Sequence, residues 1–304
     1  MQLGQHPEPS HLVLHISDPH LLAGRARLHG VVDTVEHLGA ALAQIESSSL
    51  RPDAIVFTGD LADLGEPEAY ARLRELVTPV AARLGAQIVW CMGNHDERAS
   101  YALALFGADA DGVGPQDRVY DVRGLRIIAL DTTIPGYHHG ALDPEQLAWL
   151  RDVLATPAEQ GTIIALHHPP IPSPLTPEMA VYELDNQDRL AAVIQGTDVR
   201  GILGGHLHHS THSTFAGVPV SVASATCYTL ALGDPVTSYG GRDAHQAVAA
   251  VHVYPDRIVH TTIPIGDAPL ISGVPTEQLR GEFALDLATL RERYAKKRSP
   301  SESA

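Results

Sequence analysis

Apolar runs of five or six residues, rich in β-branched side chains, recur along the first two-thirds of the chain. Each run is followed by a polar turn, and amphipathic stretches with helical spacing lie between the runs. The runs predict strands at 11–16, 54–58, 87–92, 125–130, 162–166 and 199–203. The amphipathic stretches predict helices at 31–46, 67–84, 144–154 and 186–194. This alternation is typical of an α/β protein.

The pattern changes after Leu203. Apolar runs at 211–215, 218–223, 247–254 and 258–265 are joined by short turns, which indicates hairpins and therefore some antiparallel pairing. Residues 266–275 have the composition of a linker, and residues 277–297 predict an amphipathic helix with a basic end. We expect a single domain over 1–265, followed by a linker, helix and frayed tail over 266–304.

Composition and charge narrow the classes of protein to consider. The chain has 304 residues, 44% of them hydrophobic, which suffices for one large core. A formal net charge of -15 argues against binding to a nucleic-acid polymer or an anionic membrane. Two cysteines make no disulfide framework, and no apolar run reaches the roughly 20 residues of a membrane span. We therefore expect a cytoplasmic protein without stable membrane insertion.

Five short polar clusters stand where predicted strands end. They are Asp18-Pro19-His20, Gly59-Asp60, Gly93-Asn94-His95-Asp96, His167-His168-Pro169-Pro170 and Gly205-His206-Leu207-His208. In open α/β sheets, ligands bind at the carboxyl ends of the strands, where separate segments converge. The five clusters therefore predict one site.

The residue types in these clusters indicate metal ions. Carboxylates, imidazoles and one amide, without thiolates, suit Mn, Fe, Zn or Co. Seven donors exceed the needs of one tetrahedral ion, so two ions are the economical number. The candidate ligands are Asp18, His20, Asp60, Asn94, His167, His206 and His208.

In this order, the motifs D-x-H, GD, GNH[DE], H-x-P and GH-x-H resemble those of the calcineurin-like metallophosphoesterases, over about residues 11–222. The resemblance implies a four-layer α/β/β/α sandwich of two mixed sheets flanked by helices. It also implies one metal on Asp18, His20, Asp60 and His208, and a second on Asn94, His167 and His206 with Asp60 bridging. Stretches such as MGNHDER and GHLHHSTHSTFAGVPV look like those of class III cyclic-nucleotide phosphodiesterases of the mycobacterial type.

That resemblance implies hydrolysis of 3′,5′-cyclic nucleotides to nucleoside monophosphates by a homodimer that carries Fe and Mn, with Zn or Co as alternatives. Two metals about 3.5–4 Å apart would clamp the phosphoryl oxygens and activate a bridging hydroxide for in-line attack. His95 is placed to protonate the departing oxygen, and Asp96 to orient His95. We expect substrate contacts from Asn94, His95 and His208, and from His138 and His139 in the segment IPGYHHGAL.

Several alternatives stay open. The loop GDLADLGEP contains no Arg, which favours a singly charged diester, although Arg98, Arg25 and Arg27 lie near other motifs. A broader enzyme for 2′,3′-cyclic nucleotides, glycerophosphodiesters or monoesters is the second hypothesis. A non-catalytic, metal-containing interaction protein ranks last, because all the ligand positions are present. His168 is interpreted as a group that supports His167, while His209 and His212 are open between surface and substrate roles.

Overall fold

The computed structural model describes residues 5–107, 112–174, 177–230, 240–266, 269, 271–273, 277, 282 and 285–295. One compact unit spans Pro9–Gly266, and a second comprises Met1–Glu8 with Asp267–Ala304. No helix of the described residues combines the length and the apolar character that crossing a membrane requires.

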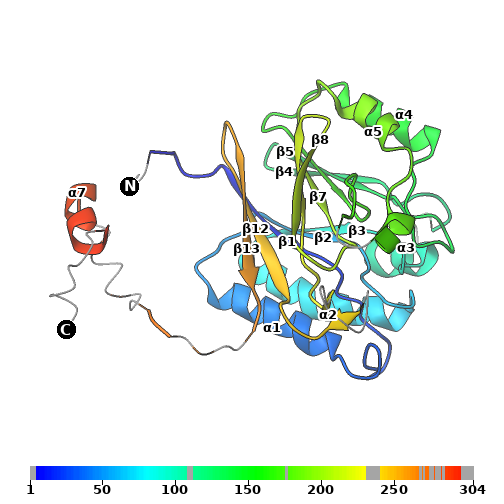
Figure 1. The fold of residues 1–304 in the computed structure, drawn as a ribbon, viewed down its shortest axis with the longest axis horizontal. Coiled ribbons are helices and arrows are strands. Elements are labelled where there is room, and N and C mark those ends of the chain that lie inside the picture. Colours follow the sequence, from blue (N-terminus) through cyan, green and yellow to red (C-terminus); the bar gives the residue numbers. More distant parts are fainter. Residues whose placement is uncertain are drawn as a thin grey trace. The chain divides into compact units, whose positions relative to one another are not determined.

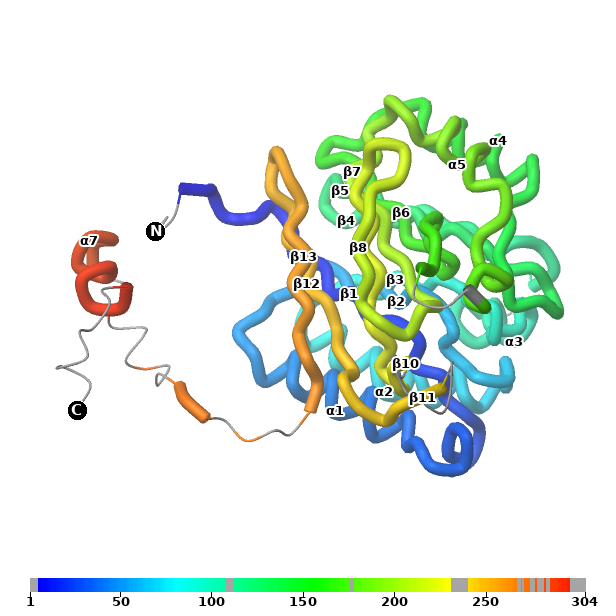
Figure 2. Tube along the Cα trace, in the orientation of Figure 1, coloured from blue at the N-terminus to red at the C-terminus, as the bar shows by residue number. Residues whose placement is uncertain are grey.

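The first sheet has five strands in the order β13-β12-β1-β2-β3 (Figure 1). The strands β1 (His11–Ile16), β2 (Ala54–Thr58) and β3 (Gln87–Cys91) are parallel. The hairpin of β12 (Ala247–Val253) and β13 (Ile258–Pro264) adds antiparallel strands beside β1, on the side away from β2 (Figure 2). Strands β1 and β2 are buried along their whole length, as expected for a sheet covered on both faces.

The second sheet has six strands in the order β4-β5-β6-β7-β9-β8. Strands β5 (Leu125–Leu130), β6 (Thr162–Leu166), β7 (Val199–Gly204) and β9 (Val218–Val222) are parallel. Strands β4 (Arg118–Val122) and β8 (Thr211–Phe215) pair antiparallel at the two edges. A separate short pair joins β10 (Thr229–Leu230) to β11 (Gly241–Arg242).

Three apolar layers hold the unit together. Side chains alternate along each strand, so Val13 of β1 faces the second sheet while Leu12 and Leu14 face the helices. The layer beneath the first sheet includes residues of α1 (Thr34–Ser47), α2 (Pro67–Leu84) and α3 (Arg98–Phe106). The layer outside the second sheet includes α4 (Pro144–Leu154) and α5 (Gln187–Ile194) (Figure 1). The predicted α/β/β/α sandwich of two mixed sheets is confirmed.

The sequence patterns missed α3, β4, β10, β11 and the 3₁₀ helix η1 (Pro177–Tyr182). One predicted helix, over 277–297, is wrong as a continuous element. Leu285 and Asp286 are not helical, and Asp286 instead accepts a hydrogen bond from the Thr289 N–H, which begins α7 (Leu287–Leu290). The π-helical η2 (Arg291–Ala295) follows, and residues 296–297 lie outside the described residues. The division at 265/266 stays a prediction.

Candidate metal centre

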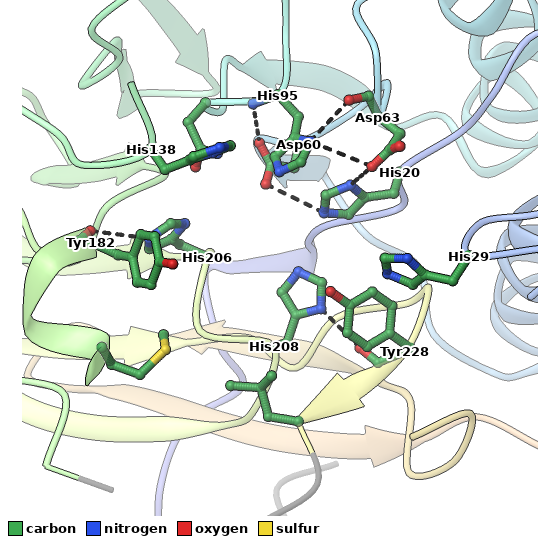
Figure 3. Close-up of a pocket in the computed structure, with 13 residues that line it drawn as sticks. His20, His29, Asp60, Asp63, His95, His138, Tyr182, His206, His208 and Tyr228 are labelled. Carbon is green, nitrogen blue, oxygen red and sulfur yellow. Dashed lines mark hydrogen bonds and ion pairs between the residues drawn. The ribbon is translucent and has the colours of Figure 1, made fainter. Parts of the chain in front are cut away.

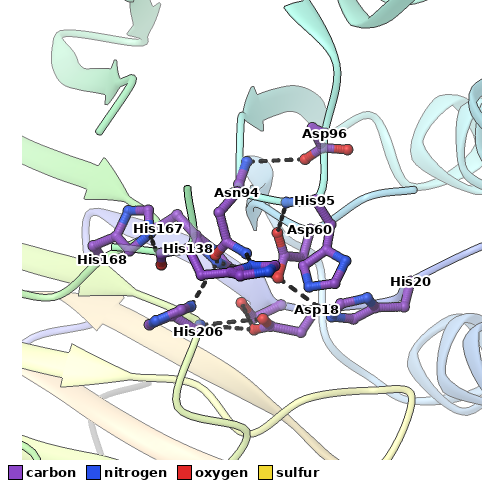
Figure 4. Close-up of polar contacts among 12 residues, drawn as sticks. Asp18, His20, Asp60, Asn94, His95, Asp96, His138, His167, His168 and His206 are labelled. Carbon is purple, nitrogen blue, oxygen red and sulfur yellow. Dashed lines mark hydrogen bonds and ion pairs between the residues drawn. The ribbon is translucent and has the colours of Figure 1, made fainter. Parts of the chain in front are cut away.

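The seven candidate ligands converge in one place, and Figure 4 labels all of them except His208. They follow the carboxyl ends of five parallel strands, which the two stacked sheets bring to the same side. Asp18 and His20 follow β1, Asp60 follows β2 and Asn94 follows β3. His167 follows β6, and His206 and His208 follow β7. Each side chain is buried or half-buried.

Asp60 lies at the centre of the cluster. Its Oδ2 is 3.3 Å from His20 Nε2 and 3.2 Å from His167 Nε2. Its Oδ1 accepts the backbone N–H of His95 at 2.9 Å. One carboxylate oxygen therefore faces nitrogen donors from both sheets, which is the geometry that a bridging ligand requires.

Two donor groups share Asp60. Ligand atoms of Asp18, His20, Asp60 and His208 all lie within 4.8 Å of one another. On the other side, His167 Nε2 is 3.0 Å from Asn94 Oδ1 and 3.2 Å from His206 Nδ1. The arrangement brings together two adjoining groups of donor side chains, and their assignment to two ions stays a prediction.

Each of the four imidazoles has one ring nitrogen bound to an oxygen outside the cluster, so the other nitrogen faces inward. The pairs are His20 Nδ1 with Asp63 Oδ1 at 2.9 Å, His167 Nδ1 with Thr58 O at 2.7 Å, His208 Nδ1 with Tyr228 O at 3.0 Å, and His206 Nε2 with Tyr182 O at 3.1 Å. Carbonyl and carboxylate oxygens only accept, so these nitrogens carry the proton. This orientation is the usual one for metal-ligating histidines.

The inward nitrogens fit cations. His167 Nε2 lies 3.2 Å from both His206 Nδ1 and Asp60 Oδ2, and His20 Nε2 lies 3.3 Å from the same Asp60 oxygen. These nitrogens therefore surround one carboxylate oxygen, and a metal ion can replace the protons that they carry. Imidazole nitrogens around carboxylate oxygens are a donor set that suits metal ions.

The backbone around the centre is strained. Asp18, His20, Asp60, His206 and His208 have φ between 43° and 72°, the left-handed region that non-glycine residues rarely adopt. They are half of the ten non-glycine residues with positive φ among the described residues. Each such residue costs about 1–3 kcal/mol, and they concentrate at functional sites. The strain turns the side chains inward at the strand ends.

Two motif glycines permit the close approach of these turns. A Cβ on Gly93 would lie 2.1 Å from the Asp60 backbone nitrogen, and one on Gly59 would lie 2.5 Å from His167 Nδ1. Gly59 also has a φ of +92°. Any larger residue would separate the loops that carry Asp60, Asn94 and His167.

Electrostatics also favours positive charge at the centre. Burial raises the pKa of the Asp60 carboxyl, but His167 and His20 outweigh it and hold that pKa well below the usual value. Burial lowers the pKa of His20, yet the Asp60 and Asp63 carboxylates raise it to about 10. His206, by contrast, has its pKa lowered to about 3 by burial and by His167. The carboxylates attract positive charge, while His206 stays neutral as a ligand must.

The contacts of Asp96 overturn one prediction. Its buried carboxylate accepts the backbone N–H groups of Leu61, Ala62 and Gly93 and the hydroxyl of Tyr70, at 2.9–3.1 Å. It therefore ties the loop after β2 to the loop after β3, and it does not orient His95. The side chain turns into the protein because the peptide N–H groups of both loops are available only there.

Asp63 takes the place that was predicted for Asp96. The carbonyl oxygen of Asp63 lies 2.9 Å from His95 Nδ1, and its Oδ1 lies 3.4 Å from the same atom. The same carboxylate contacts His20, as described above. The signal for Asp63 was present in the loop GDLADLGEP, three residues after Asp60.

A pocket of about 200 Å³, called here the central pocket, opens over the cluster (Figure 3). Its lining includes His95 and His138 together with Met179, Leu230 and four polar residues that the sequence did not single out. These are His29, Asp63, Tyr182 and Tyr228. None of the described residues that line it is a lysine or an arginine. Arg98 turns away to contact Asp131 at 3.2 Å, and Arg27 lies 3.6 Å from Asp33.

The two histidines of the segment after β5 separate. His138 Nδ1 accepts from the Asn94 amide at 2.9 Å and lies in the central pocket. His139 does not line the pocket, and its Nε2 lies 3.8 Å from Asp185 Oδ2. This position does not support the predicted contact between His139 and the substrate. His168 Nε2 donates to the His138 carbonyl at 3.1 Å and thereby supports the pocket wall. His209 and His212 also lie outside the lining.

Comparison with known proteins places the fold and this site in one family. The model of the calcineurin-like phosphoesterases matches residues 11–210, which contain all seven candidate ligands. The chain belongs to the calcineurin-like phosphoesterase family.

Two relatives resemble the chain over most of its length. A cAMP/cGMP dual specificity phosphodiesterase of Mycobacterium tuberculosis is 57% identical over 267 residues, 88% of this chain and 83% of that protein. A probable cyclic nucleotide phosphodiesterase of Rhodococcus erythropolis is 49% identical over 94% of both chains. Among solved structures, a dimetal phosphatase from Danio rerio shares the fold with a TM-score of 0.60 at 16% identity, over 85% of this chain and 97% of that one.

Proposed function

We propose that this protein hydrolyses 3′,5′-cyclic nucleotides, cAMP or cGMP, to nucleoside monophosphates at a centre of two metal ions. The observation that carries the proposal is the pair of donor groups that share Asp60 Oδ2. The choice of substrate rests on the two relatives, which match most of the chain and whose names specify cyclic nucleotides. The alternative is an esterase of broader specificity, which would also hydrolyse 2′,3′-cyclic nucleotides, glycerophosphodiesters or monoesters.

Asp18, His20, Asp60 and His208 would hold one ion, and Asn94, His167 and His206 the other, with Asp60 contributing to both. When bound, such a pair supplies Lewis-acid stabilisation of the phosphoryl oxygens and lowers the pKa of water toward neutrality. The protein's own part is to fix the ligands. The outward hydrogen bonds of the imidazoles and the strained turns hold each donor in place before substrate arrives.

His95 is the proposed proton donor to the departing ribose oxygen. Its Nδ1 is bound to the Asp63 carbonyl, so Nε2 is the ring atom left for the central pocket, which His95 lines. Its ring lies 4.7 Å from the ring of His20 and 5.2 Å from that of His138. Asn94, His138 and His208 complete the proposed substrate contacts.

His95→Ala tests this role. Losing a general acid costs about 100- to 10,000-fold in rate, so we expect kcat for cAMP to fall in that range while two metals per chain are retained. His139→Ala is the matched control, because His139 does not line the pocket, and its kcat should stay within about twofold. An inactive His95→Ala protein that had also lost its metals would show that His95 acts on the metals and not on the leaving group.

The lining of the central pocket supports a diester. A dianionic monoester benefits from arginine forks, and no arginine or lysine is among the described lining residues. The test compares cAMP, cGMP, 2′,3′-cyclic AMP, AMP and a glycerophosphodiester with one preparation. We expect kcat/KM for the 3′,5′-cyclic nucleotides to exceed that for AMP by about 100-fold or more. Equal values for AMP would contradict the diester preference.

Iron and manganese are the proposed metals, since both suit carboxylate and imidazole ligands, with zinc or cobalt as alternatives. We also propose that the protein is a homodimer in the cytoplasm. Elemental analysis of protein from its native host would test the metals, sedimentation would test the dimer, and cell fractionation would test the location.

A further inference from the structure

We infer that the nucleobase of the substrate binds against a wall formed by Tyr228 and His29, beside the proposed metal centre. The inference rests on the proposed function, because it assigns one part of a cyclic nucleotide to one part of the pocket. None of the sequence motifs points to this wall. It is visible only in the folded chain.

Two hollows meet at this wall. The central pocket of about 200 Å³ shares His29, Tyr228 and Leu230 with a second hollow of about 500 Å³, called here the outer hollow. Val31, Val32, Gly241 and Asp243 complete the lining of the outer hollow. Small-molecule sites usually measure about 300–1,000 Å³, so the central pocket alone is small for a nucleotide. With its phosphate at the candidate ligands, a substrate has room to extend past Tyr228.

The wall has the chemistry that a planar base requires. The Tyr228 ring lies 4.5 Å from the ring of His208 and 5.3 Å from that of His29, measured between centroids. Tyr228 thus lies between a candidate metal ligand and the rim of the pocket, on the side away from His138 and Tyr182 (Figure 3). Aromatic side chains stack on bases, and each such contact contributes about 1–3 kcal/mol.

The lining of the outer hollow includes a carboxylate that can accept hydrogen bonds, that of Asp243. Asp243 Oδ1 accepts from Gln246 Nε2 at 2.8 Å and lies 3.4 Å from His37 Nε2, and its side chain is half exposed. A carboxylate suits the amino group of adenine or the N1–H and amino group of guanine. Apolar walls with one placed polar group are the usual form of a ligand site.

A different neighbouring hollow suits a base less well. It measures about 230 Å³ and adjoins the central pocket at Asn94. Its lining includes Glu97 and Asp96 together with Arg98, whose guanidinium already pairs with Asp131. This hollow lacks an aromatic face among the described residues, so stacking favours the wall of Tyr228.

The experiment removes the base from the substrate and the ring from the wall, separately and together. The substrates are cAMP and 1-O-methylribofuranose 3′,5′-cyclic phosphate, which keeps the reacting phosphate and has no base. The proteins are the wild type, Tyr228→Leu and His29→Ala, with Tyr137→Leu as the matched control because Tyr137 is exposed and lines neither hollow. Metal content is measured for each, since the Tyr228 ring contacts His208.

In the wild type, KM for the base-free substrate should exceed that for cAMP by about tenfold. Tyr228→Leu should raise KM for cAMP by about tenfold with kcat within about twofold, and so bring the ratio of the two KM values close to one. His29→Ala should lower the ratio by about threefold, and Tyr137→Leu should leave it as in the wild type.

A ratio that stays near tenfold in both Tyr228→Leu and His29→Ala would overturn the inference, because the base would then be bound elsewhere. Equal KM values for the two substrates in the wild type would also overturn it. Failure of the proposed function looks different: the metal-loaded wild type would hydrolyse neither cyclic phosphate, whatever the variants did.

Discussion

Two charged networks, one buried and one partly buried, lie at opposite ends of the same parallel strands of the second sheet. At the carboxyl ends of β6 and β7 is the candidate metal centre. At their amino ends, Arg126 of β5 binds both carboxylate oxygens of Asp198, just before β7, at 2.9 and 3.1 Å. The same guanidinium donates to Thr162 Oγ1 and to the carbonyls of Val153 and Thr156. This second network is called here the Arg126 network.

The two networks differ in how their charges are balanced. In the Arg126 network the positive and negative groups neutralise each other, and Asp198 also accepts the Ala158 N–H at 2.8 Å. In the candidate metal centre, the buried carboxylates of Asp18 and Asp60 face imidazoles, which carry a positive charge only when they are protonated. A guanidinium is charged at every physiological pH and stabilises the fold, whereas imidazoles around carboxylates can exchange their protons for metal ions. The predictions below test that distinction.

Asp60→Asn should have the largest effect on catalysis. The amide keeps the shape and tolerates the positive φ of position 60, but it lacks the charge that two cations would share. We expect kcat/KM for cAMP to fall by about 10,000-fold or more, since metal-ion stabilisation contributes several kcal/mol. The unfolding midpoint of the metal-free protein should also fall, by about 5 °C, because the ion pairs of Asp60 with His20 and His167 are lost. Retention of a tenth of the activity would contradict the bridging role.

Arg126→Met should lower stability and leave catalysis intact. Removing the guanidinium from this partly buried pair should cost about 1–3 kcal/mol, because Asp198 loses its counter-charge and keeps only the hydrogen bonds from Ala158 and Thr162. For a domain of this size, the unfolding midpoint should fall by about 5 °C. At a temperature where the variant is folded, kcat/KM should stay within about twofold.

The matched control for Arg126→Met is Arg83→Met. Arg83 pairs with Glu46 at the surface, where Arg83 is exposed and Glu46 partly exposed, so the midpoint should move by no more than about 2 °C. Equal shifts of the unfolding midpoint in the two variants would show that the Arg126 network stabilises the second sheet no more than a surface ion pair does.

Asp63→Ala should have the smallest effect of the three, because Asp63 acts through His20 and His95. Loss of a partner that orients a metal-ligating histidine typically costs 10- to 100-fold in metal affinity or activity. We expect metal affinity to fall in that range, measured by competition with a chelator. Asp63→Asn retains an oxygen acceptor for the His20 N–H, so it should recover most of the affinity, and failure to do so would mean that the charge of Asp63 matters more than its hydrogen bond.

The sequence predicted the structure best where an apolar run with the pattern of a strand is followed directly by polar residues that can bind metal ions. Strands such as β1 and β2 have uninterrupted apolar runs, and the candidate ligands lie in the turns directly after them, so the strands and the convergence of these side chains could be predicted. Strand β4 could not, because its residues alternate in exposure at a sheet edge and their pattern is short. Tyr182 and Tyr228 orient ligands through backbone carbonyls, which leave no signature in side-chain identity.

The direction of a side chain in an irregular loop was also beyond prediction. His95 and Asp96 are adjacent, yet one lines the central pocket and the other is buried beneath the loops. His138 and His139 separate in the same way. In a strand the alternation of side chains would decide such cases, but in a turn the backbone dihedrals decide them, and these depend on tertiary contacts.

The measurement that tests the central claim most directly is a titration of metal-free protein with Mn²⁺, followed by hydrolysis of cAMP to AMP. We predict that activity rises with added metal and reaches its plateau at two equivalents per chain, with two ions found by elemental analysis. A plateau at one equivalent, or two bound ions without formation of AMP, would contradict the account.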